Sequence, residues 1–329
     1  MRWKSAQVLV LLITLALIAG LFVRPRLALD VLWFVLIPIL PATFLINAGL
    51  WRGICPLATA NDLGPSDRGK VLARNWINPA AAVGIVLLFV LVPGRHLVFN
   101  QQGPALAVVI LAVTVLAAVL GLIFRAKSGF CNSICPVLPV EKLYGQAPLV
   151  AVRNSRCVPC NLCTAKGCLD IDPSISVKTA VGNGEGVSEW IRTPFGIFAA
   201  SFPGFVFGYF QVSDVPLSAW LSVYGTILGY ALGSLVVVAL LVALLKIPNQ
   251  RLMPFLGALA AGMYYWYAAP ASMAAFDLPG GMVLRWVLLV LVAFWLFRAL
   301  FRSGEHAAPQ RPVGAHPVTP QFPLGGPAR

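Results

Sequence analysis

Eight apolar runs, each long enough to cross a lipid bilayer, constrain this chain more than any other feature. A membrane-spanning helix needs about 20 predominantly apolar residues. Because 59% of the 329 residues are hydrophobic and only 11% are charged, one water-soluble core could not hide them all, so lipid is the solvent for much of the chain. We therefore predict an all-α integral membrane protein of about eight transmembrane helices, near Gln7–Val23, Leu27–Leu50, Ala80–Val98, Pro104–Phe124, Pro194–Val212, Ser218–Leu245, Leu252–Ala269 and Met282–Phe301.

The positions of Lys and Arg predict the orientation of these helices. With the N-terminus inside, all of the 24 basic residues except Arg24, Arg26, Arg95 and Arg285 fall in cytoplasmic segments, as the positive-inside rule requires. The prediction is a multi-pass protein of the bacterial inner membrane with both termini in the cytoplasm. The first run has no convincing cleavage site and is interpreted as an uncleaved helix. The net charge of +13 indicates anionic lipid headgroups as neighbours and needs no nucleic acid to explain it.

The inner connections divide the chain into four parts. Residues 1–124 hold the first four predicted helices with an inner loop at 51–79, and residues 125–193 form a cytoplasmic cysteine-rich loop. Residues 194–301 hold the last four helices. The tail at 302–329 is rich in Pro, Gly and Ala, a composition that predicts disorder.

All seven cysteines lie in the two inner loops. Disulfides are rare in a reducing cytoplasm, so free thiols or metal ligands remain. The run Cys157-Val-Pro-Cys160-Asn-Leu-Cys163 is typical of a [4Fe–4S] site, because two-residue gaps let three thiolates from one tight loop reach three corners of the cube. Cys168 is the predicted fourth ligand. Zinc is the alternative metal, although zinc sites usually use two separated Cys-x2-Cys pairs.

The other three cysteines lie where predicted helices end. Cys131-Asn-Ser-Ile-Cys135-Pro136 follows the fourth span, and Ile54-Cys55-Pro56 follows the second as a partial copy. Spacing of i, i+4 places Cys131 and Cys135 on one face of a helix end. One interpretation is a second metal site at the membrane surface, formed by Cys55, Cys131 and Cys135 and one thiolate short of four. In a second interpretation, these cysteines are small buried residues where helices meet. In a third, Cys131 or Cys135 supplies the fourth ligand to the cluster held by the Cys157–Cys163 run.

These motifs resemble the membrane-bound polyferredoxin family. Its members include the quinol-side ferredoxin-type accessory proteins of periplasmic nitrate reductase, the regulators of nitrous-oxide reduction and the assembly factors of cbb3-type cytochrome oxidases. The resemblance covers roughly Trp51–Asp172 and rests on Cys55-Pro56, on Cys131-x3-Cys135-Pro136 and on the ferredoxin-like run. Trp51 stands where the first C-x3-C-P motif would begin, only one run is present, and there is no flavin-binding domain. The resemblance implies electron transfer.

The sequence therefore predicts a membrane-bound [4Fe–4S] protein that passes electrons between a quinol pool or a cytoplasmic donor and a partner redox enzyme. It would be a subunit or accessory protein rather than a stand-alone enzyme, since no hydrolytic constellation is present. Two alternatives stay open: an assembly or regulatory factor for a metalloenzyme, and a structural zinc-loop membrane protein. His96, His306 and His316 lie at an outer edge and in the tail, which argues against intramembrane bis-histidine haem. Ionisable residues such as Asp30 and Arg285 fall only near span ends, which argues against an ion pump.

Overall fold

The computed structural model describes residues 3–63, 70, 76–124, 129–150, 177, 189–247 and 249–302. Within these ranges the only β-contact is an isolated bridge between Lys70 and Phe124, so the predicted all-α fold is confirmed. The helices are α1 (Trp3–Val23), α2 (Pro25–Val31), η1 (Leu32–Leu36), α3 (Ile37–Ile54), α4 (Pro56–Asn61), α5 (Ile77–Leu91), η3 (Arg95–Phe99), α6 (Gly103–Ile123), η4 (Phe130–Ile134), α7 (Leu138–Tyr144), η6 (Glu189–Arg192), α10 (Pro194–Tyr209), η7 (Leu217–Ala219), α11 (Trp220–Leu245), α12 (Asn249–Ala274) and α13 (Gly281–Arg302).

Each of the eight predicted spans is helical, and six stretches are long and apolar enough to cross a membrane. By length and composition these six, among the described residues, are Lys4–Val23, Pro25–Ile54, Asn78–Phe99, Gly103–Ile123, Leu217–Leu245 and Gly281–Phe301. The protein is therefore a multi-pass membrane protein. The two predicted spans outside this set correspond to α10 and α12.

Helices α10 and α12 are less suited than the other six spans to face lipid, and their burial explains this difference. Helix α10 has 16 residues and is about 24 Å long, shorter than the roughly 30 Å hydrocarbon core. Helix α12 has 26 residues but carries Tyr264, Tyr265 and Trp266 in its second half. Most residues of α10 are buried against the rest of the bundle, and α12 packs on both α10 and α13. A helix surrounded by protein needs neither full bilayer length nor a lipid-compatible surface.

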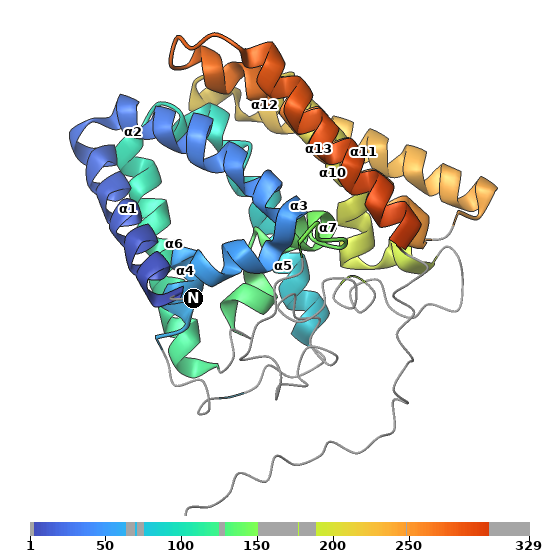
Figure 1. The fold of residues 1–329 in the computed structure, drawn as a ribbon, viewed down its shortest axis with the longest axis horizontal. Coiled ribbons are helices and arrows are strands. Elements are labelled where there is room, and N and C mark those ends of the chain that lie inside the picture. Colours follow the sequence, from blue (N-terminus) through green and yellow to red (C-terminus); the bar gives the residue numbers. More distant parts are fainter. Residues whose placement is uncertain are drawn as a thin grey trace, which may run out of the picture.

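The helices form an N-terminal group (α1 to α7) and a C-terminal group (α10 to α13). Helices α10, α11, α12 and α13 lie together at one side of the molecule, and α1, α2, α3 and α6 surround the other side (Figure 1). Helix α7 lies between the groups and contacts α3, α5, α10 and α12. This central position is important because α7 follows the Cys131–Cys135 motif directly in the chain.

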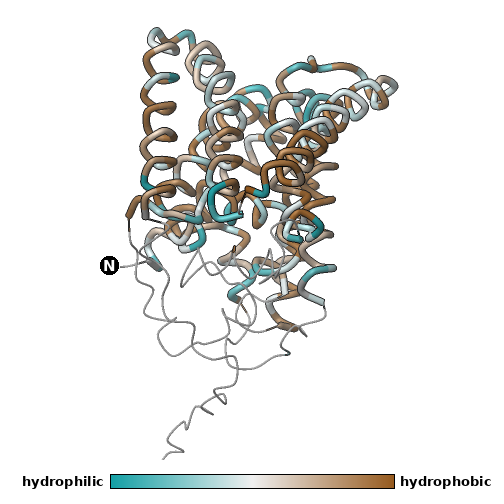
Figure 2. Tube along the Cα trace, turned by 90° about the vertical axis from the view of Figure 1, so that its right-hand side faces the viewer, coloured by the Kyte–Doolittle hydropathy of each residue, from teal (hydrophilic) through white to brown (hydrophobic). Residues whose placement is uncertain are grey.

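The outward faces of the long helices are apolar. Leu221 and Leu240 on α11, Val290 and Phe297 on α13 and Leu15 on α1 each expose more than half of their surface. Figure 2 shows the long helices as hydrophobic along most of their length. Exposed apolar surface of this extent is unfavourable in water, so these faces contact lipid.

Candidate metal and redox site

The cysteines of the predicted [4Fe–4S] site lie outside the described residues. Cys157, Cys160, Cys163 and Cys168 all fall between residues 151 and 176. The iron–sulfur site that they predict therefore stays a prediction. The structure does describe the other three cysteines, together with the end of the chain segment that leads into the run.

Two connectors carry these three cysteines, and they share one local design. The first connector (55–61) is Cys55 followed by α4, and the second connector (130–144) is η4, Cys135 and α7. Cys55 (φ −56°, ψ 127°) and Cys135 (φ −60°, ψ 122°) each end a helix in nearly the same conformation. A proline follows each, and it turns the chain because a proline cannot donate a backbone hydrogen bond. The weak sequence symmetry therefore corresponds to a repeated structural element.

The two helix ends differ in the spacing of the last backbone hydrogen bond. The Cys55 amide donates to the Trp51 carbonyl four residues back (2.7 Å), whereas the Cys135 amide donates to the Phe130 carbonyl five residues back (3.1 Å). Cys131 thus lies in a π-helical turn rather than in the predicted α-helical one. Single π turns are rare and occur frequently at functional sites.

The three cysteines come together in one apolar cluster. Cys131 and Cys135 are buried with Ala58, Ala117, Phe130 and Leu138, and the half-buried Cys55 packs against the same cluster. Cys55 and Cys135 are free thiols. Soft thiols suit an iron–sulfur cluster or zinc. Among the described residues, however, no group of three or more His, Cys, Asp or Glu side chains is arranged to hold a metal ion. The second metal site stays a prediction.

Burial keeps two of these thiols protonated. The pKa of Cys55 is raised to about 11 and that of Cys135 to about 12, mainly by loss of solvent and to a smaller extent by the nearby Glu141 carboxylate. For Cys55, the positive charge of Arg52 acts in the opposite direction. The thiolate is the metal ligand and the nucleophile, so any metal bound here must displace protons from both sulfurs.

A buried arginine fixes the second connector to α3. Arg52 is 3% exposed, and its Nη2 donates to the Cys131 carbonyl (3.2 Å) and to Asn132 Oδ1 (2.5 Å). Its Nε lies 3.5 Å from Glu141 Oε2 on α7. One guanidinium therefore links the end of α3, the cysteine-bearing π turn and α7. Sequence reasoning counted Arg52 and Lys142 as inner-loop charges and did not consider Glu141, so it missed these buried ionisable groups.

Both connectors pack closely against neighbouring helices of the bundle. The predicted position at the membrane surface stays a prediction. Gly84 lies seven residues into α5, and a Cβ there would come within 3.0 Å of the Cys135 carbonyl. A Cβ on Gly121 of α6 would lie 2.1 Å from the Asn61 carbonyl at the end of the first connector. Glycine at both positions permits this close approach. Irregular backbone at such positions is tolerated because protein surrounds it.

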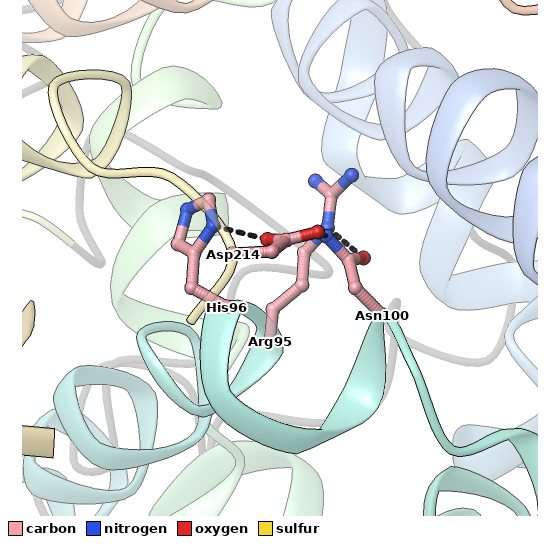
Figure 3. Close-up of polar contacts among 4 residues, drawn as sticks. All are labelled: Arg95, His96, Asn100 and Asp214. Atoms are coloured by element: carbon pink, nitrogen blue, oxygen red, sulfur yellow. Dashed lines mark hydrogen bonds and ion pairs between the residues drawn. The ribbon is translucent and has the colours of Figure 1, made fainter. Parts of the chain in front are cut away.

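A second polar cluster lies beyond the far end of α5. Asp214 accepts hydrogen bonds from His96 Nδ1 (2.7 Å) and from Asn100 Nδ2 (2.8 and 2.9 Å), and Arg95 Nε donates to Asn100 Oδ1 (2.8 Å). Figure 3 shows the Asp214 carboxylate between His96 and Asn100. Arg95 also lies over the Trp33 ring, 4.5 Å from its centroid.

This cluster, which sequence reasoning also missed, ties η3 to the chain that leads into η7. Asp214 contacts both His96 and Asn100 across more than a hundred residues of sequence, so no local pattern could have indicated the pairing. Its contacts form a structural clasp between the two helix groups, because the His96 Nδ1 and Asn100 Nδ2 atoms both bond to Asp214; the buried Nε2 of His96 has no hydrogen-bond partner among the described residues.

No protein-family model matches the chain, and no curated protein or solved structure matches it either. The family resemblance therefore rests on the cysteine and proline motifs alone.

Proposed function

We propose that this protein is a membrane-bound iron–sulfur protein of the polyferredoxin type, which passes single electrons between a quinol pool or a cytoplasmic donor and a partner redox enzyme. The observation that carries the proposal is the run Cys157-x2-Cys160-x2-Cys163 with Cys168 four residues later. Three thiolates at two-residue spacing are the ligand pattern of a [4Fe–4S] cluster, which would supply one-electron redox chemistry.

Two structural observations support this proposal. The chain is a multi-pass membrane bundle, so a cluster in an inner loop would lie close to a lipid-soluble donor. The Cys55-Pro56 and Cys135-Pro136 elements, on which the family resemblance partly rests, adopt nearly the same conformation. We place both termini and the cysteine run on the cytoplasmic side of the inner membrane, because the basic residues concentrate there.

The charges around the run fit a redox partner of opposite sign. Arg153, Arg156 and Lys166 lie within or next to it. Positive charge near a cluster favours the reduced state, which is the more negative one, and it attracts an acidic protein surface. We therefore propose that the partner enzyme presents an acidic patch to this loop.

The test is reduction of the cluster by candidate donors. The full-length protein, purified anaerobically in detergent and reconstituted in nanodiscs, would be mixed with duroquinol or with reduced ferredoxin and frozen for EPR. After subtraction of the donor's own signal, we expect a reduced-cluster signal with at least one donor, at an intensity comparable to that after dithionite, and no such signal in Cys160→Ser. A cluster that dithionite reduces but neither donor reduces would contradict electron transfer and favour an assembly or regulatory role.

A further inference from the structure

Helix α3 is broken at Asn47, and the break receives hydrogen bonds from a distant segment. Asn47 has φ −172° and ψ 115° inside an otherwise helical run. The carbonyls of Leu45 and Ile46 accept from the amides of Leu149 (3.2 Å) and Val150 (3.0 Å). The Asn47 amide group completes the join, because its Nδ2 donates to the Val150 carbonyl (2.7 Å).

Pro41, the proline inside α3, does not account for this break. Pro41 disturbs the helix toward its own i−4 residue, Ile37, and not six residues further on. A buried backbone carbonyl without a partner is costly, so the unwound turn persists because Leu149 and Val150 supply its donors. The Asn47 side chain also accepts from the Gly49 amide (2.7 Å). A Cβ on Gly49 would lie 2.9 Å from Asn47 Oδ1, so glycine there leaves room for the buried side chain.

The hydrogen bonds between the break in α3 and Leu149 and Val150, called the join below, lie next to the cysteine run in the sequence. Val150 is the last described residue before the cysteine run, and Cys157 follows it by seven residues. The same helix holds the π turn of Cys131 through Arg52. One element therefore contacts both the Cys131 turn and the last described residues before the run.

We infer that Asn47 is a positioning residue for the cysteine run: it holds the unwound turn of α3 to Leu149 and Val150 and so fixes where the cluster-bearing segment leaves the bundle. The cluster itself rests on the proposed function. The anchoring of the segment does not, and the two can be tested separately.

The experiment compares Asn47→Ala with Asn61→Ala in the full-length protein in detergent. Asn61 is a matched control, because it is equally buried and its Nδ2 donates to a backbone carbonyl, that of Ala117 (2.8 Å), away from this join. Trypsin cleavage after Arg153 reports the anchoring without any need for iron, and EPR of the reduced cluster reports its surroundings. Val150→Pro is a second test, since it deletes the amide that bonds to Ile46 without touching α3.

We expect Asn47→Ala and Val150→Pro to speed cleavage after Arg153 about tenfold, as the loss of one or two hydrogen bonds allows. Both variants should shift or broaden the EPR signal at unchanged iron content, and Asn61→Ala should change neither property. Cleavage rates and EPR signals equal to wild type in both variants would overturn the inference. Absence of iron from the wild type would instead contradict the proposed function, and the cleavage rates would still decide whether Asn47 anchors the segment.

Discussion

The N-terminal group of helices (α1 to α7) and the C-terminal group (α10 to α13) use their interiors differently. In the described residues, every π-helical segment belongs to the first group. Among the residues that the structure describes, the first group also buries seven polar or charged side chains, whereas the second buries only Ser201; the seven are Asn47, Arg52, Asn61, His96, Ser133, Glu141 and Lys142. Buried polar groups are costly unless they are bonded. The comparison indicates that the second group is an apolar scaffold and that the first holds most of the buried polar contacts.

The largest expected effect comes from breaking the buried ion pair of the first group. Arg52→Met leaves the Glu141 carboxylate buried without its guanidinium, which typically costs about 3–5 kcal/mol. Chemical unfolding of the purified protein in detergent would measure this loss. Arg251→Met, at an exposed position of α12, is the control and should change stability by no more than about 0.5 kcal/mol.

The double variant Arg52→Met/Glu141→Gln tests the electrostatic cause. It should recover part of the lost stability, because the side chain at position 141 then carries no buried charge that has lost its guanidinium partner. An Arg52→Met variant as stable as the Arg251→Met control would remove the basis for the contrast between the two groups.

Thiol reactivity gives the next largest effect. With the four run cysteines replaced by serine, Cys55 should react with maleimide at pH 7.5 at least about 100-fold more slowly than an exposed cysteine, since a raised pKa leaves little thiolate. The rate should climb as the pH approaches 11 for Cys55 and 12 for Cys135. Leu278→Cys, in the exposed turn between α12 and α13, supplies the reference. Equal rates for Cys55 and this reference at pH 7.5 would refute the buried cluster.

A pair of glycine substitutions compares packing in the two groups directly. Gly121→Ala places a methyl group 2.1 Å from the Asn61 carbonyl, whereas Gly229→Ala on α11 meets nothing within 4 Å. Overpacking of this kind costs about 1–3 kcal/mol, and alanine at an open helical position is neutral or stabilises by up to about 1 kcal/mol. Thermal unfolding of both variants would show the difference, and equal losses would mean that the first connector is not closely packed on α6.

The smallest effect is expected at the clasp between the groups. Asp214→Asn removes the charge that accepts from His96 and Asn100. The Asp214 side chain is 42% exposed, so the loss should stay below about 1 kcal/mol. Asp277→Asn is a suitable control: Asp277 is exposed and has a φ of 52°, which asparagine tolerates. A loss above about 2 kcal/mol at Asp214 would show that the clasp is a principal contact between the groups.

The helices were predictable from the sequence because long apolar runs have few alternatives in lipid. The repeated Cys-Pro element was also visible, since Ile54-Cys55-Pro56 and Ile134-Cys135-Pro136 encode the same turn locally. The break at Asn47 was not, because it depends on Val150, 103 residues away. Arg52 was misjudged for a related reason. The positive-inside rule assigns basic residues to the inner side, but it does not reveal that Arg52 is buried and paired with a carboxylate on another helix.

The most direct test of the central claim is the iron and acid-labile sulfide content of the anaerobically purified wild-type protein and of Cys160→Ser. The account predicts about four iron and four sulfide per chain in the wild type and a loss of both in the variant. About eight iron would add a second cluster at Cys55, Cys131 and Cys135. Zinc without sulfide in the wild type would contradict the account and leave a structural metal loop in a membrane bundle.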